Sequence, residues 1–307
     1  MKRLICIVLA LCVLVGLSGC AVAPTADVRN KLGIGADASY TVSDTQKATV
    51  ETTWAAVMLD ANDRILACRI DAIKADVTPG VEGASFATKY DLKEAYGMVA
   101  YAGADKEWYQ QVDIFCEAVV GKTLEEAMNL QPGEADLAAG CTISVLPLQY
   151  ALAKACQSAQ PVDAAASDTL SVKLQGSASA ADGKDEFEFT FAAVTIADGK
   201  VTACRYDSLP FAIALENSGY KAEDSGAMFP SKREQGFDYG MVAHAGAQYE
   251  WFQQIDALEA AVIGKTAAEI AGLLGDNGKI REDVDLASTA TIYAGGIVDQ
   301  IVAAVGQ

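Results

Sequence analysis

Residues 88–113 read TKYDLKEAYGMVAYAGADKEWYQQVD, and residues 231–256 repeat this pattern without a gap as SKREQGFDYGMVAHAGAQYEWFQQID. Three further blocks recur in the same order, namely residues 53–71 with 190–207, 120–127 with 263–270, and 136–143 with 285–292. Matched blocks in one order indicate a tandem duplication with about 120 residues per copy. We name residues 37–157 copy one and residues 170–307 copy two, and expect residues 158–169, which lack hydrophobic periodicity, to link them.

Each copy begins with sequence that is typical of paired strands. Residues 187–196 and 201–206 are rich in β-branched and aromatic side chains. They flank Asp198-Gly199, a pair that favours a tight hairpin turn. Copy one has its corresponding turn at residues 62–63.

Helical patterns follow this hairpin. Apolar residues at helical spacing predict a helix over residues 106–120, with one buried face made of Trp108, Val112, Phe115 and Val119. Gly121 suits the left-handed position after it, and the capping box that begins at Thr123 starts a second helix. A closing helix is expected over residues 147–156. The sequence therefore predicts the α+β class, with two tandem homologous domains, each a small antiparallel sheet or hairpin with about three helices.

The N-terminus predicts export and lipid attachment. Two basic residues precede an apolar run over residues 4–15, as in a signal peptide, and this run is too short to span a bilayer. Residues 17–20 read LSGC and resemble the lipobox of bacterial lipoproteins. We expect residues 1–19 to be removed and residues 20–36 to form a tether. The protein is then extracytoplasmic and anchored to the cell membrane, at the cell surface or in the periplasm, by lipid on Cys20.

Composition excludes several classes of function. The net charge is −18, and losing two basic residues with the signal makes it more negative, which disfavours nucleic acid as a partner. His244 is the only histidine and no C-x-x-C occurs, so a metal site is not expected. The cysteines of the mature chain beyond Cys20 are odd in number and are expected to be buried free thiols; they are Cys68, Cys116, Cys141, Cys156 and Cys204.

Two other recurring motifs favour structural roles. Gly121-Lys122-Thr123 lacks the upstream glycine that a phosphate-binding P-loop needs. Cys68-Arg69-Ile70-Asp71 recurs at residues 204–207, and alternation along a strand predicts that Arg69 and Asp71 pair on one face while Cys68 is buried on the other.

The last repeated block carries the functional hypothesis. Residues 136–142 read DLAAGCT and residues 285–291 read DLASTAT. Both resemble the flavinylation motif of FMN-binding domains, roughly D-x-x-[ST]-G-A-[ST]. In that family the last Thr or Ser forms a phosphoester with FMN, which a dedicated flavin transferase attaches. The chemistry requires an accessible hydroxyl, small neighbours, and backbone N–H groups or a helix N-terminus to hold the phosphate.

The resemblance assigns a role to each motif residue. It implies that Thr142 and Thr291 are the FMN acceptors and that Asp136 and Asp285 are the motif aspartates. Copy one keeps the motif glycine as Gly140, and copy two keeps the motif serine as Ser288. Copy one has Ala139 and Cys141 at the other two positions, and copy two has Thr289 in place of the glycine.

The leading hypothesis is a membrane-anchored lipoprotein that carries covalent FMN for periplasmic or extracellular electron transfer. Its partners would be a flavin transferase and a redox partner in the membrane. The cofactor carries the redox step, so the chain need not supply acid–base catalysis. No catalytic set for hydrolysis or group transfer is expected, because His244 is replaced by Tyr101 in copy one.

A second hypothesis from another class remains open. The chain would be a non-catalytic cell-envelope binding or scaffold lipoprotein that has lost the flavin and uses the cleft between its copies. The recurring aromatic residues Tyr96, Trp108, Tyr239 and Trp251 fit either hypothesis, as core residues or as contacts for a planar ligand.

Overall fold

The computed structural model describes residues 28–134, 137, 140–221 and 229–306. The predicted signal peptide, the lipidation site Cys20, the motif aspartate Asp136 and Ala139 lie outside the described residues. Among the described helices, none is both long and apolar enough to cross a membrane.

Each copy forms a meander of three long antiparallel strands. The strands are β1 (Asn30–Asp44), β2 (Lys47–Leu59) and β3 (Ile65–Val77) in copy one, and β6 (Thr169–Ala181), β7 (Lys184–Ala197) and β8 (Lys200–Glu216) in copy two. The turn predicted between β7 and β8 is confirmed, since Asp198 and Gly199 have left-handed φ values of 50° and 72°. A tight hairpin of this kind needs positive φ at both central residues.

Short strands lie at the sheet edges, and one of them pairs with a strand of the other copy. The strand orders are β3-β2-β1-β5 and β4-β6-β7-β8-β9. The strand β4 (Ala84–Phe86) belongs to copy one but pairs with β6 of copy two. The strand β5 (Gln160–Val162) lies in the predicted linker and pairs with β1, and β9 (Gly219–Tyr220) pairs antiparallel with the end of β8.

Helices cover the outer face of each sheet. Copy one has α1 (Lys89–Leu92), η1 (Lys93–Tyr96), α2 (Met98–Ala102), α3 (Trp108–Val119), α4 (Leu124–Met128) and α5 (Leu146–Ser158). Copy two has α6 (Lys232–Gln235), η3 (Gly236–Tyr239), α7 (Met241–Ala245), α8 (Trp251–Val262), α9 (Ala267–Ala271), η4 (Asp285–Ser288) and α10 (Gly295–Val305).

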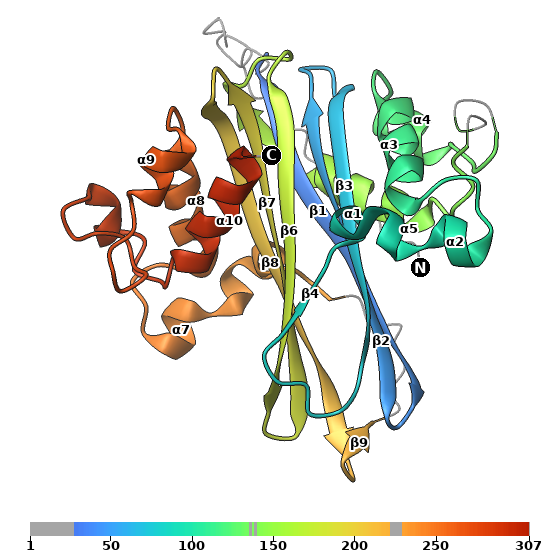
Figure 1. The fold of residues 1–307 in the computed structure, drawn as a ribbon. Helices are drawn as coiled ribbons and strands as arrows, with labels where there is room; N and C mark the ends of the chain where they lie inside the picture. Colours follow the sequence, from blue (N-terminus) through green and yellow to red (C-terminus); the bar gives the residue numbers. More distant parts are fainter. Residues whose placement is uncertain (1–27, 135–136, 138–139, 222–228, 307) are drawn as a thin grey trace, which may run out of the picture.

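The molecule is built of four layers, helices on sheet on sheet on helices (Figure 1). One hydrophobic cluster lies between the two sheets and contains residues of both copies, with the rings of Trp54 and Phe191 stacked 5.3 Å apart. Two further clusters lie between each sheet and its own helices. The α+β class is therefore confirmed. The division into two tandem domains stays a prediction, because the central core is shared.

The local patterns that predicted the helices hold. The apolar face of α3 is buried, and the capping boxes of α4 and α9 form at Thr123 and Thr266. Gly121 and Gly264 adopt left-handed φ values of 80° and 77° just after the long helices. The short helices α1 and α2 and their counterparts in copy two were missed, because segments of four or five residues show little periodicity.

Two predicted boundaries are wrong. The expected tether, residues 20–36, overlaps the first half of β1, which begins at Asn30 and buries Leu32 and Ile34. The expected linker, residues 158–169, includes β5. Within the described residues, the start of β1 pairs with β2 and β5, and β5 pairs with β1, a stabilisation that the composition of these segments does not reveal.

Candidate functional site

The predicted acceptor threonines lie on equivalent turns just before the closing helices. Thr142 is exposed, and its turn is held by the side-chain carbonyl oxygen of Gln111. This Oε1 accepts hydrogen bonds from the Thr142 N–H at 2.8 Å, the Ile143 N–H at 3.1 Å and the Thr142 hydroxyl at 3.2 Å. The Gln111 amide nitrogen donates to the Lys106 carbonyl oxygen at 2.9 Å, which ties the turn to the start of α3.

Copy two repeats this arrangement. Thr291 is exposed, and Gln254 Oε1 accepts from the Thr291 N–H at 2.9 Å, the Ile292 N–H at 3.1 Å and the Thr291 hydroxyl at 3.2 Å. The Gln254 amide donates to the Tyr249 carbonyl oxygen at 3.0 Å. Gln111 and Gln254 are 1% and 0% exposed. The sequence reasoning missed both glutamines, although their identity in the two copies was a usable signal.

The turn geometry fits esterification of the threonine. Ester formation would remove the hydroxyl proton, and so the longest of the three bonds to Gln111, while the two backbone bonds would still hold the turn. Of the expected phosphate-binding groups, backbone N–H groups or a helix N-terminus, the N–H groups of Thr142 and Ile143 are already bonded to Gln111. The first turn of α5, which begins at Leu146, remains the nearby source of backbone N–H groups.

The remaining motif residues shape the backbone. Gly140 has φ of +121°, a region that other residues rarely adopt, and the Lys106 side chain would lie 2.5 Å from a Cβ there. Copy two accommodates Thr289 at the same place because φ is −107°. Ser288 donates to the Asp285 carbonyl oxygen at 2.9 Å inside η4, so these two residues stabilise the turn that precedes Thr291.

A cavity lies beside each threonine turn. The cavity of copy one has a volume of about 550 Å³ and is lined by Ile143, Lys89, Tyr96 and Trp108, among others. Its counterpart in copy two has about 350 Å³ and is lined by Ile292, Tyr293, Lys232 and Trp251, among others. Both volumes are within the range of small-molecule sites, about 300–1,000 Å³.

The predicted aromatic contacts are divided between core and cavity. Trp108 and Trp251 are each 6% exposed, so most of each indole packs in the core while its edge lines the cavity. Tyr96 lines the cavity of copy one, whereas Tyr239 lines a neighbouring cavity on the sheet of copy two. The two sites also differ because Ser144 lines the cavity of copy one, whereas the larger Tyr293 lines the cavity of copy two at the corresponding position.

Among the described residues, three cavities are lined by residues from both sides of the boundary between the copies. One of about 200 Å³ lies between β3 and β6, one of about 530 Å³ lies between β5 and β8, and one of about 720 Å³ lies beside β4, β6 and β8. The last two are within the usual size range of a ligand pocket. The outer cavities are the candidate sites because each adjoins a threonine turn that recurs in both copies, and not because of their size.

The predicted pairing of Arg69 with Asp71 is wrong. Asp71 accepts the N–H groups of Ala72 at 2.7 Å and Tyr90 at 3.2 Å, and Arg69 donates to the Cys68 carbonyl oxygen at 3.3 Å. The buried Asp71 carboxylate thus links β3 to the start of α1, the helix that carries Lys89. The predicted burial is confirmed for Cys68, Cys116, Cys141 and Cys204, whereas Cys156 is only partly buried.

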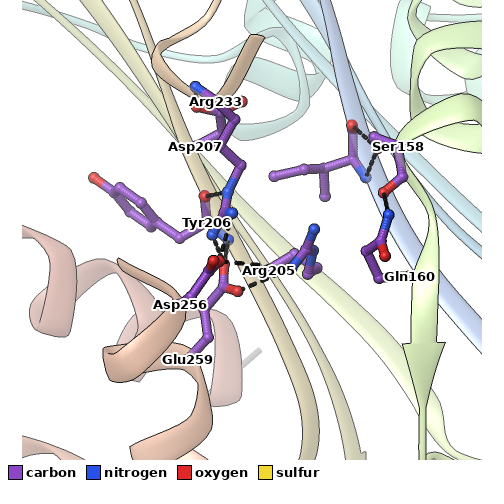
Figure 2. Close-up of polar contacts among 9 residues, drawn as sticks. Ser158, Gln160, Arg205, Tyr206, Asp207, Arg233, Asp256 and Glu259 are labelled. Carbon is purple, nitrogen blue, oxygen red and sulfur yellow. Dashed lines mark hydrogen bonds and ion pairs between the residues drawn. The ribbon is translucent and has the colours of Figure 1, made fainter. Parts of the chain in front are cut away.

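Copy two has an ion cluster at the corresponding place, which Figure 2 shows. Asp207 accepts the Arg233 N–H at 3.1 Å. Glu259, 5% exposed, accepts from Arg205 at 3.2 Å, from Arg233 at 2.5 Å and from the Tyr206 N–H at 2.6 Å. Arg205 thus pairs with Glu259 of α8 and not with Asp207, the aspartate of its own strand motif.

Burial makes the two strand carboxylates sensitive to pH. Desolvation raises the pKa of Asp71 to about 7 and that of Asp207 to about 6, above the ordinary value near 3.9. The folded state then binds more protons than the unfolded state between these values, so stability falls as pH rises through this window.

We expect the free energy of unfolding to fall by about 2 kcal/mol between about pH 5 and about pH 7 through Asp71 alone. Asp71→Asn should remove this part of the slope in urea denaturation, because the amide stays neutral and its oxygen still accepts the backbone bonds. Asp207→Asn should remove about 1 kcal/mol. Equal slopes in wild type and Asp71→Asn would contradict the prediction.

No protein-family model matches this chain, and neither a curated protein nor a solved structure matches it.

Proposed function

We propose that this chain is a membrane-anchored extracytoplasmic lipoprotein that carries FMN on Thr142 and Thr291 and serves in electron transfer. One observation carries the proposal: each copy has an exposed threonine, whose hydroxyl donates to a buried glutamine, on a turn whose next residue lines a cavity with an aromatic wall. The arrangement recurs in both copies although their motif residues differ.

The residues around each cavity suit a planar ring. The indole edge of Trp108 or Trp251 provides an apolar wall, and the threonine provides the covalent attachment point. Bound FMN would supply the redox chemistry. The chain would bind and orient the ring and limit its contact with water. On this proposal the two copies are homologous units, each with one FMN site on its own outer face.

The proposal also covers location and partners. Lipid on Cys20 would hold the protein at the membrane, a flavin transferase would attach FMN, and a membrane redox partner would supply or accept electrons. The lipobox at residues 17–20 supports the anchor.

The test is the intact mass of the protein after co-production with a flavin transferase. We expect mass for two esterified FMN groups in the wild type, for one in Thr142→Ala or Thr291→Ala, and for none in the double variant. Ser144→Ala removes a neighbouring exposed hydroxyl and is the matched control, which should keep both groups.

Two results would overturn the proposal. One is wild-type protein without added mass, as the alternative of a cofactor-free binding or scaffold lipoprotein predicts. The other is label that persists in the double threonine variant.

A further inference from the structure

A largely buried lysine lies in the wall of each candidate cavity. Lys89 is the first residue of α1 and Lys232 is the first residue of α6. Their side chains are only 11% and 13% exposed, and both line the cavities beside the threonine turns. Lysine is seldom buried without a reason, because desolvating an ammonium group is costly.

Each ammonium group lies over a pair of aromatic rings. Lys89 Nζ is 5.3 Å from the ring centres of Tyr96 and Trp108. In copy two, Lys232 Nζ is 5.4 Å from the Tyr239 ring and 5.3 Å from the Trp251 ring. These distances are within cation–π range.

A single carboxylate on the sheet partners each lysine. Glu51 Oε1 is 3.6 Å from Lys89 Nζ, and Glu188 Oε1 is 2.7 Å from Lys232 Nζ. Within the described part of the chain, Glu51 is the only carboxylate that forms an ion pair with Lys89. An ammonium group has three donors, so Lys89 retains capacity to bind a ligand in the cavity.

The lysine is the same in both copies, although other residues that line the two cavities differ. Asp37 and Ser144 of copy one correspond to Gln175 and Tyr293 of copy two. The acceptor threonine, the glutamine that holds it, the tryptophan, and the lysine with its glutamate are the same in both copies. The constant set comprises an attachment point, an aromatic wall and one buried cation.

We propose that Lys89 and Lys232 recognise the electron-rich polar edge of a planar aromatic ligand in these cavities and raise the reduction potential of a flavin bound there. This inference rests on the proposed function, since it specifies how the same cavities treat their ligand. Two-electron reduction with uptake of one proton leaves negative charge on the ring, which a nearby ammonium group stabilises. The electrons come from an external reductant, which is dithionite in the test below.

The experiment measures the midpoint potential of one site at a time. Lys89→Met is made in a Thr291→Ala background and Lys232→Met in a Thr142→Ala background, with loading checked by intact mass. We expect each Lys→Met variant to lower the midpoint potential of its site by about 30 mV. For a two-electron couple this is about a tenfold loss in the preference for the reduced over the oxidised ligand. Lys89→Arg and Lys232→Arg keep the charge and should restore the potential.

Exposed lysines provide the matched controls. Lys93→Met in copy one and Lys200→Met in copy two remove the same charge away from the cavity linings and should leave the potential unchanged. Fully loaded Lys→Met proteins with the wild-type potential would overturn the inference and leave the proposed function intact.

A second measurement decides the case in which wild-type protein carries no covalent label and the proposed function fails. Free FMN is titrated into unlabelled wild type and into Lys89→Met and Lys232→Met, with flavin fluorescence as the readout. Binding that weakens about tenfold in the variants supports lysine recognition of the ring, and the Arg variants should restore it. Equal affinity in wild type and variants, or no binding to wild type, overturns the inference.

Discussion

Trp54→Ala is expected to lower the free energy of unfolding by about 3–5 kcal/mol, the usual cost of deleting a large buried aromatic side chain. Trp54 is 0% exposed and stacks on Phe191 of the other copy. The cavity would open between two long sheets, whose backbones cannot close it without disturbing strand pairing. Urea denaturation followed by far-ultraviolet circular dichroism measures the loss.

The same measurement tests whether the copies share one core. Tyr101→Ala, at a side chain that is 89% exposed, is the control and should change stability by less than about 0.5 kcal/mol. If the sheets pack as described, Trp54→Ala destabilises both copies in one transition. Two separate transitions, with copy two unaffected, would contradict the shared core.

Glu259→Cys is expected to cost about 2–3 kcal/mol, because it removes the buried carboxylate that Arg205 and Arg233 share and leaves the half-exposed Asp256 as their remaining acidic partner. Cysteine is the residue of copy one at this position, where Cys116 is buried beside Cys68. Copy one also has Tyr90 in place of Arg233, and the Tyr90 hydroxyl donates to Asp113 at 2.8 Å. At this equivalent position, copy one thus has a tyrosine–aspartate hydrogen bond and copy two has an arginine–carboxylate cluster.

The double variant makes this prediction specific. Arg233→Tyr alone should also destabilise, since it leaves Glu259 with one arginine partner. Combined with Glu259→Cys it restores the arrangement of copy one, with Asp256 available to accept from the new hydroxyl group. A double-mutant cycle should show favourable coupling of about 1–3 kcal/mol. Strict additivity in urea denaturation would contradict a coupled buried pair.

Much of the local structure could be predicted from the sequence. The Asp198-Gly199 turn, the apolar face of α3 and the capping boxes at Thr123 and Thr266 all formed as expected. Each depends on residues within a few positions of one another, so the stabilising contacts can be identified from spacing. The resemblance to the flavinylation motif required Thr142 and Thr291 to lie on accessible turns, and both residues are exposed just before the closing helices.

The partners of side chains were harder to predict. Alternation along the strand placed Cys68 correctly, but the spacing in Cys-Arg-x-Asp did not identify the partner of either charge. Arg205 pairs with Glu259 at a separation of 54 residues, and Asp71 bonds to backbone N–H groups. A strand pattern determines which face a side chain is on, whereas the element packed against that face determines its partner.

By itself, the sequence determined the duplication, the α+β class, and the local turns and helix caps, because these features follow from repeated residues and from short-range geometry. Only the tertiary structure decided that the two sheets pack face to face, that β4 and β5 pair across the expected boundaries, and that Gln111 and Gln254 hold the threonines. It also placed Lys89 and Lys232 over aromatic rings. These contacts join segments far apart in the chain, and their formation depends on how well distant surfaces fit, which no local pattern specifies.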